Sequence, residues 1–292
     1  MWKLLIVILK RRLSLIYMAI LIKKLKVLTE IEPGIVPKSY SYLNEPLGLG
    51  ILNANLGYLR ESGWVESKVT NTSFFSGEFY PWITFPAIDF LETLELRGSA
   101  IVEFGAGASS VYFAKRSRKV ISYEFDSTYY NEISKLSKNF FNLEIMNYDP
   151  SVVKNISGDI LLSEFERDKL LISCLGEDLR RFGINTKLTL ETGLYPSASK
   201  NISEADLIFI DGGPRNLALA LVARFASESA IVIVDNSERN DVGVGIGALS
   251  SAGFYEIPFA GIGPLNPYKW QTSFFVKNLE ALSLTSKSKQ MF

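Results

Sequence analysis

A chain of 292 residues, 47% of them hydrophobic and 21% charged, is long enough to bury a substantial core. It has no histidine, which excludes a Ser-His-Asp triad, a His-ligated zinc site and an imidazole base, and its single cysteine, Cys174, excludes an internal disulfide. Seven of the 31 Lys and Arg residues and none of the 31 Asp and Glu residues fall within residues 1–28, so the rest of the chain is acidic, and we expect no nucleic-acid partner.

Residues 1–39 are predicted to form a basic and apolar N-terminal helical extension with a linker. Its apolar runs at 4–9 and 13–22 are separated by three cations at 10–12. In a single membrane-spanning helix these cations would cost roughly 9 kcal/mol, against about 6 kcal/mol returned by the apolar residues, so spanning is disfavoured. Two alternatives stay open: residues 1–28 bind an anionic membrane surface, or they pack on the body. We expect a cytoplasmic protein, with peripheral attachment to the inner face of a membrane as the alternative.

Residues 40–99 are predicted to form an N-terminal cap, with a helix over 86–96 that leads into the main domain. The cap contains an aromatic cluster that is interpreted first as core packing and alternatively as one wall of an acceptor pocket: Phe79, Tyr80, Trp82 and Phe85.

From residue 100 onward, apolar strand-like runs alternate with helical patterns. This predicts an α/β fold, a Rossmann-like doubly wound, mostly parallel seven-stranded sheet in a main domain over 100–279, with a tail over 280–292. Strands are expected over 100–104, 119–124, 206–211 and 230–235, and helices over 109–117, 127–139, 214–226 and 242–252. Runs at 254–259 and 272–277 predict a C-terminal antiparallel strand pair. An insertion is expected over about 148–205, and the third sheet strand is either 142–146 or 187–191.

Glycines and polar residues gather where these strands end. Gly105 and Gly107 follow the first strand, and Glu124 ends the second. Open α/β sheets bind ligands at this edge. A dinucleotide fingerprint would have a third glycine where this chain has Ser110. The alternative for the turn is a bare strand-to-helix connection, and for Glu124 a surface acid.

The motifs EFGAGASS, YEFD, FIDGG and VDNS, with the closing strand pair, resemble those of class I S-adenosylmethionine-dependent methyltransferases over roughly residues 80–277. The resemblance implies that the Gly-rich turn approaches the methionine and ribose parts of the cofactor and that Glu124 holds the ribose hydroxyls. The cofactor-binding residues expected on this basis are Glu103, Gly105, Gly107, Ser109 and Glu124.

Asp211, which ends the fourth strand, and Asp235 with Asn236, which end the fifth, resemble the Asp, Asp-Asn arrangement of cation-dependent O-methyltransferases. That resemblance implies an Mg²⁺ site made by these three residues, with Asp211 as the catalytic contact to the acceptor. The family's lysine is missing here, because Pro214 stands in its place and Arg215 follows. The alternative is that Asp235 and Asn236 cap the following turn while Asp211 faces the substrate without metal.

The function expected from these patterns is methyl transfer from S-adenosylmethionine, with O-methylation of a hydroxyl on a small molecule or glycan. The glycan acceptor is suggested by the phrases PWITFPAI, IDGGPRN and VDNSER, which are similar to a bacterial methyltransferase group associated with surface glycans. Two alternatives stay open: a nicotinamide-dependent oxidoreductase, which Ser110 disfavours, and a non-catalytic, membrane-associated binding protein with the same fold.

Overall fold

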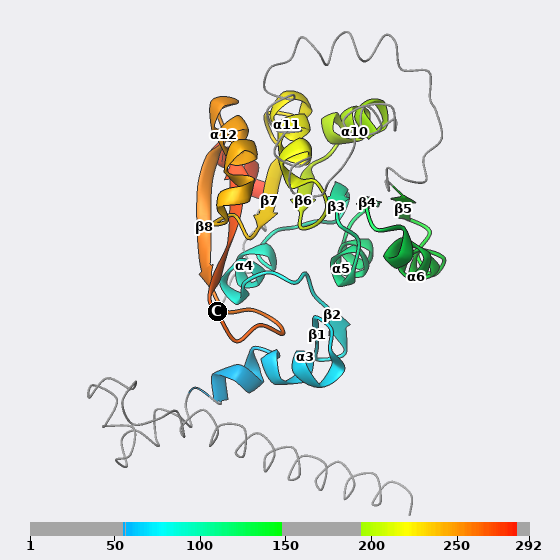
Figure 1. Ribbon diagram of the computed structural model, residues 1–292, viewed down its shortest axis with the longest axis vertical. Helices are drawn as coiled ribbons and strands as arrows, with labels where there is room; N and C mark the ends of the chain where they lie inside the picture. Colours follow the sequence, from blue (N-terminus) through cyan, green and yellow to red (C-terminus); the bar gives the residue numbers. More distant parts are fainter. Residues whose placement is uncertain (1–54, 56, 148–193, 285–292) are drawn as a thin grey trace, which may run out of the picture. The chain divides into compact units, whose positions relative to one another are not determined.

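The computed structural model describes residues 55, 57–147 and 194–284 (Figure 1). Contacts divide the chain into two compact units, Met1–Tyr58 and Leu59–Phe292, and every element named below belongs to the second. The predicted N-terminal extension, most of the predicted insertion and the alternative third strand at 187–191 lie outside the described residues. Within the described ranges, no helix has the length and apolar character needed to cross a membrane.

Seven strands among the described residues form one sheet in the order β5-β4-β3-β6-β7-β9-β8. The first five of these are parallel, β9 runs antiparallel to β7, and β8 pairs antiparallel with β9. The predicted Rossmann-like sheet and its C-terminal antiparallel pair are therefore confirmed, and the third strand is the one before the insertion. The strands are β3 (Ala100–Phe104), β4 (Lys119–Glu124), β5 (Leu143–Asn147), β6 (Leu207–Ile210), β7 (Ile231–Asp235), β8 (Tyr255–Gly261) and β9 (Trp270–Val276).

Helices cover both faces of the sheet (Figure 1). One face carries α4 (Phe85–Leu91), α5 (Ala108–Arg116) and α6 (Ser127–Ser137), and the other carries α10 (Leu194–Ser203), α11 (Arg215–Phe225) and α12 (Gly243–Ser251). Local chemistry sets their ends. The Asp126 carboxylate accepts from the backbone N–H groups of Thr128 and Tyr129 and so starts α6. Gly253, with φ +89°, follows the end of α12 as predicted.

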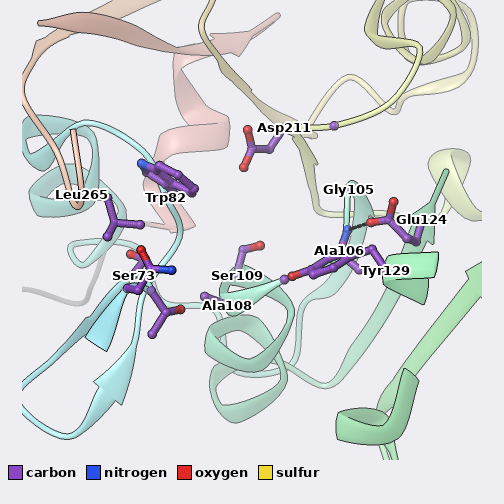
Figure 2. Close-up of a pocket in the computed structure, with 14 residues that line it drawn as sticks. Ser73, Trp82, Gly105, Ala106, Ala108, Ser109, Glu124, Tyr129, Asp211 and Leu265 are labelled. Carbon is purple, nitrogen blue, oxygen red and sulfur yellow. Dashed lines mark hydrogen bonds between the residues drawn. The ribbon is translucent and has the colours of Figure 1, made fainter. Parts of the chain in front are cut away.

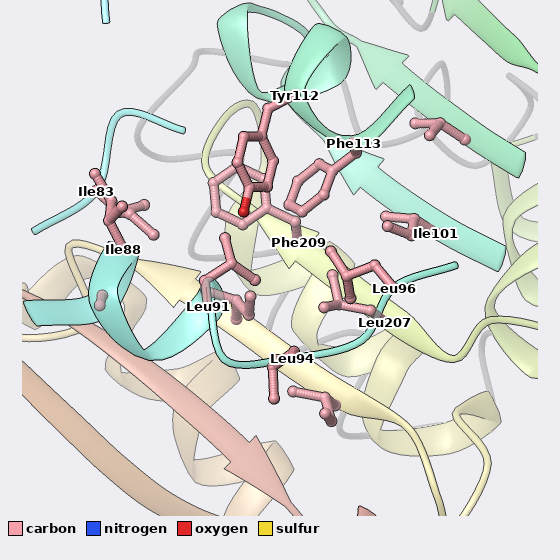
Figure 3. Packing of buried hydrophobic residues seen from close by; sticks show 14 of the residues in the cluster. Ile83, Ile88, Leu91, Leu94, Leu96, Ile101, Tyr112, Phe113, Leu207 and Phe209 are labelled. Atoms are coloured by element: carbon pink, nitrogen blue, oxygen red, sulfur yellow. The ribbon is translucent and has the colours of Figure 1, made fainter. Parts of the chain in front are cut away.

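The strands are apolar on both faces because each face is covered. Along β3, Val102 and Phe104 pack in the cluster under α10, α11 and α12, whereas Ile101 packs in the cluster under α4 and α5. Phe113 of α5 is fully buried in that second cluster and meets the ring of Phe209 edge-on, with 5.6 Å between centroids (Figure 3). Burying one such side chain stabilises the fold by about 1.5–3 kcal/mol.

The last part of the predicted insertion, residues 194–205, belongs to the core. Its helix α10 buries Ala198 and Ile202 completely, and both lie in the cluster that also contains α11. This helix precedes β6, which pairs with β3, whereas β5 lies at the far edge of the sheet. The chain therefore crosses from the edge back to the centre between β5 and β6.

The cap contains α3 (Trp64–Thr70), a short hairpin of β1 (Phe74–Phe75) and β2 (Glu78–Phe79), and α4. The predicted helix over 86–96 ends earlier, at Leu91. Leu94 and Leu96 are buried in the same cluster as α4 but lie beyond the end of the helix. Their apolar spacing matches a longer helix, whereas the backbone leaves the helical conformation after Leu91.

Candidate functional site

The strand order reverses between β3 and β6, and the turns after these two strands lie against each other there. Gly105 has φ +97°, and a Cβ on it would lie 2.7 Å from the backbone nitrogen of Gly212. The N–H groups of Asp211 and Gly212 both donate to the carbonyl of Phe104, at 2.9 Å each. Gly105 is thus required by the fold itself, through its backbone conformation and this close approach.

A cavity of about 310 Å³ opens at this edge (Figure 2), at the lower end of the size range of small-molecule sites. The Gly-rich turn, the first turn of α5, the ends of β4 and β6, the cap and the loop before β9 form its wall. The lining residues are Asn71, Thr72, Ser73, Trp82, Gly105, Ala106, Gly107, Ala108, Ser109, Glu124, Tyr129, Asp211, Gly212 and Leu265. The cavity therefore brings together four of the five predicted cofactor-binding residues and the predicted catalytic residue.

Glu124 lies at the end of β4 with its carboxylate in the pocket wall. One carboxylate oxygen accepts from the N–H of Ala106 at 3.0 Å (Figure 2). The other accepts from the N–H of Asp126 at 2.8 Å. Burial raises the pKa of Glu124, while these backbone hydrogen bonds act in the opposite direction. The carboxylate is thereby fixed between two turns and retains acceptor capacity for ligand hydroxyls.

Glu103 is the predicted cofactor-binding residue that does not line the cavity. It is fully buried on the sheet face covered by α5, where its carboxylate accepts hydrogen bonds from the hydroxyls of Ser109, Ser110 and Ser122. Burial raises its pKa to about 7, against the effect of the three hydroxyl donors. Since Ser109 lines the cavity, Glu103 supports the site from behind the turn.

Gly107 precedes α5, and its N–H donates to the hydroxyl of Ser110 at 3.0 Å. Its φ of 174° is extended backbone, so this position does not need glycine for its conformation. A Cβ on Gly107 would lie 3.5 Å from the hydroxyl of Tyr129, another residue of the pocket wall. A longer side chain there would enter the cavity, which is the property expected of a cofactor-binding glycine.

Asp211 brings a carboxylate to the cavity wall on the side opposite Ser109 (Figure 2), with 28% of its side chain exposed. Burial raises the pKa of Asp211, and the charge of Arg215 opposes that shift. Asp235 is buried behind it, and burial, followed by the charge of Asp211, raises its pKa to about 8. The structure thus brings the ends of β6 and β7 together, as the sequence motif requires.

Each of the three predicted Mg²⁺ ligands has a side-chain oxygen that is engaged by a protein donor. Asp235 Oδ1 accepts from Trp270 Nε1 at 2.9 Å and from Thr272 Oγ1 at 2.7 Å. Arg215 donates to Asn236 Oδ1 at 3.2 Å, and its guanidinium is 3.2 Å from Asp211 Oδ1. Across the described part of the chain, no group of three or more His, Cys, Asp or Glu residues is placed to hold a metal.

The four aromatic residues of the cap do not share one role: one lines the cavity, and the other three pack against neighbouring residues of the fold. Trp82 lines the cavity with 43% of its surface exposed. Tyr80 instead packs on Tyr112, with 5.6 Å between ring centroids, and Phe85 is buried in the core. Phe79 meets Phe74 edge-on, across the β1–β2 hairpin.

Several lining residues were missed by sequence reasoning: Asn71, Thr72, Ser73, Tyr129 and Leu265. Asn71 and Leu265 have positive φ angles, 53° and 67°. For a bulky residue such as leucine this conformation is rare, and such outliers cluster at functional sites. Among these residues, Tyr129 is the one that the sequence could have indicated as a lining residue, because it lies in the first turn of the helix that follows Glu124.

Neither a protein-family model nor a curated protein matches the sequence. Three solved structures with a similar fold are a TehB-like SAM-dependent methyltransferase from Corynebacterium glutamicum (14% identity, 65% of this chain and 86% of that chain covered, TM-score 0.36), a putative O-methyltransferase from Klebsiella pneumoniae (14%, 66% and 78%, 0.39) and Aeropyrum pernix fibrillarin with natively bound S-adenosyl-L-methionine (10%, 62% and 67%, 0.37). The fold assignment rests on the strand order and register of the sheet.

Proposed function

We propose that this chain is an S-adenosylmethionine-dependent methyltransferase that binds its cofactor in the pocket at the carboxyl edge of the sheet. The observation that carries the proposal is the charge of the wall: among the described residues that line the cavity, the charged side chains are the carboxylates of Glu124 and Asp211. A sulfonium cation attached to a ribose suits such a wall. A diphosphate would meet two negative charges and no Lys or Arg there.

The predicted residues have distinct parts in this proposal. Glu124 accepts from the ribose hydroxyls, and Gly107 leaves room for the cofactor beside Tyr129. The first turn of α5, with Ala108 and Ser109, lines the cavity, where its N–H groups favour the carboxylate of the methionine part. Glu103 holds Ser109 in place through its hydroxyl.

Asp211 is proposed to receive the proton of the acceptor hydroxyl. In the transfer, the bond between the methyl carbon and the sulfonium sulfur breaks as the carbon–oxygen bond forms in line with it. The hydroxyl proton passes to the Asp211 carboxylate, which leaves S-adenosylhomocysteine and a methyl ether. Burial raises the pKa of Asp211 and so makes its carboxylate a stronger base. Most of the rate enhancement then comes from alignment of sulfur, carbon and oxygen.

We propose a neutral, hydroxylated acceptor, a small molecule or a glycan unit. Support comes from the wall that faces the Gly-rich turn, where Trp82, Ser73 and Leu265 lie on the side away from Glu124 (Figure 2). The side chains of Asn71, Thr72 and Ser73 are uncharged, and groups of this kind can both donate hydrogen bonds to and accept them from hydroxyl groups. The half-exposed indole of Trp82 offers a flat apolar surface on which a sugar ring can pack.

Calorimetry on the full-length protein with S-adenosylmethionine, S-adenosylhomocysteine and NAD(H) tests the proposal. We expect the two adenosyl ligands to bind with one-to-one stoichiometry and NAD(H) not to bind. A Trp82→Ala variant should retain S-adenosylhomocysteine affinity while losing methyl transfer to hydroxylated acceptors, because Trp82 is assigned to the acceptor side. NAD(H) binding would favour the oxidoreductase alternative, and binding of none of these ligands would favour a non-catalytic protein.

A further inference from the structure

Arg215 is a buried cation at the start of α11 that the proposed reaction does not use. Only 10% of its side chain is exposed, and it is not among the residues that line the cavity. Its guanidinium lies where the ends of β6 and β7 meet, which is also where the three predicted metal ligands converge.

The guanidinium contacts four oxygen atoms from these strand ends. Nη2 donates to the backbone carbonyl of Asp211 and, at 3.2 Å, to its Oδ1. Nη1 donates to the carbonyl of Asp235 and, at 3.2 Å, to Oδ1 of Asn236. One carboxylate oxygen, one side-chain amide oxygen and two backbone carbonyls are hard oxygen ligands of the kind that Mg²⁺ and Mn²⁺ take. In this protein all four oxygens instead contact the guanidinium of Arg215.

Local structure holds Arg215 in this position. It lies four residues after Asp211, so the GGP turn brings its side chain back to the strand end. The next residue, Asn216, donates to the carbonyl of Asp241 at 2.7 Å and accepts from the N–H of Gly245 at 2.9 Å, which ties the start of α11 to α12. Arginine stays charged at every physiological pH, and its planar fork donates to several acceptors at once.

We propose that the Arg215 guanidinium is the fixed cation of this strand-end cluster and occupies the position at which a divalent cation would otherwise bind. Arg215 is therefore a positioning residue, because it holds the Asp211 carboxylate at the pocket wall without touching a ligand. The inference rests on the proposed function only in taking Asp211 to face the acceptor.

The test is a Mn²⁺ titration of the full-length protein, with free Mn²⁺ counted by electron paramagnetic resonance. Wild type is compared with Arg215→Met, which removes the charge at similar length, and with Arg215→Lys, which retains it. Arg239→Met is the matched control, because Arg239 follows β7 but pairs with Asp241 on the surface. Far-UV circular dichroism and calorimetry with S-adenosylhomocysteine report whether each variant is folded.

We expect no Mn²⁺ binding at the cluster in wild type, Arg215→Lys or Arg239→Met, and at least tenfold tighter Mn²⁺ binding in Arg215→Met, lost again when Asp211→Asn is added, because Asp211 supplies the side-chain carboxylate of the cluster. If Arg215 had only a structural role, Mn²⁺ binding would not increase in Arg215→Met while remaining absent in Arg215→Lys, which retains the charge. Stoichiometric Mn²⁺ binding to wild type that Asp211→Asn abolishes would overturn the proposal even if Arg215→Met fails to fold. A folded Arg215→Met that binds no more Mn²⁺ than wild type would also overturn it.

The Mn²⁺ test and the ligand-binding test of the proposed function can fail independently. Wild type that binds S-adenosylhomocysteine and also holds Mn²⁺ at this strand-end cluster contradicts only the role of Arg215. Wild type that excludes Mn²⁺ from the cluster but binds no adenosyl ligand contradicts only the methyltransferase.

Discussion

At the scale of single residues, the two acids near the Gly-rich turn, Glu124 and Glu103, have different surroundings and therefore different expected roles. Glu124 faces the cavity, and both of its oxygens accept from backbone N–H groups, whereas Glu103 is enclosed by three serine hydroxyls behind the turn. Both have raised pKa values because of burial. Ligand binding should therefore depend directly on Glu124, and the pH dependence of stability should depend on Glu103.

Replacing Glu124 with alanine should weaken S-adenosylhomocysteine binding by about 1–3 kcal/mol, because buried ribose hydroxyls would lose a charged acceptor. Calorimetry measures the change, with Glu144→Ala, an exposed acid on β5, as the control that should bind normally. Unchanged affinity in a folded Glu124→Ala protein would remove the ribose assignment.

The two glycines of the turn should respond differently to substitution. Gly105→Ala should lower the free energy of unfolding by about 1–3 kcal/mol or more, because φ is +97° and the new Cβ would meet Gly212. Gly107→Val should leave a folded protein with weakened S-adenosylhomocysteine binding, since its side chain enters the cavity. Thermal unfolding and calorimetry on both variants distinguish the two effects. If Gly107→Val binds normally, the cofactor lies elsewhere.

The raised pKa of Glu103 predicts a pH-dependent stability. Because the folded-state pKa is about 7 and the unfolded value is 4.5, the folded protein binds this proton more tightly. The contribution of Glu103 is full below pH 4.5 and is lost as pH rises through 7, by about 3 kcal/mol. Urea unfolding should show wild type losing stability relative to Glu103→Gln between pH 5 and pH 8. A difference between the two proteins that does not change with pH would contradict the prediction.

At the scale of elements, side chains of β9 donate hydrogen bonds to Asp235 and so hold the end of β7 in place. Thr272 of β9 is fully buried, donates to Asp235 Oδ1 at 2.7 Å and accepts from the N–H of Thr84 at 3.2 Å. The antiparallel pair that closes the sheet thus also supplies the hydrogen bonds that hold a buried acid beside the pocket and that anchor the cap before α4.

Thr272→Val retains the side-chain shape but removes both hydrogen bonds, so it should lower the free energy of unfolding by about 1–3 kcal/mol. Urea unfolding at pH 7 measures this, and Thr128→Val, at an exposed position of α6, should change stability little. Equal stabilities of the two variants would show that the β9 contact does not support Asp235.

At the scale of the whole molecule, charge separates the N-terminal residues from the rest. The seven cations of residues 1–28 lie outside the described residues, and the remainder of the chain is acidic. We predict salt-sensitive binding of the full-length protein to anionic vesicles, because unopposed cations beside apolar runs favour such surfaces. Deletion of residues 1–28 should abolish this binding and leave S-adenosylhomocysteine affinity intact. Flotation assays in which both proteins partition equally would contradict surface attachment through this segment.

The sequence by itself determined the elements of the sheet and the edge at which the site lies. Apolar periodicity and capping are local, so β3, β4, α6 and the closing strand pair were found close to their observed bounds. Glu124 could be placed at the pocket because it directly ends a strand in a fold whose ligands bind at that edge.

Only the tertiary structure decided what the predicted site residues touch. Asp235 accepts hydrogen bonds from Trp270 and Thr272, which lie 35 and 37 positions away in the chain. Asn236 accepts a hydrogen bond from Arg215, which lies 21 positions away. The cap supplies Asn71–Ser73 to a pocket whose other wall begins at Gly105. No local pattern encodes these contacts, because they arise when strand ends and loops distant in sequence are packed together, and hydrogen-bond partners are assigned only at that point.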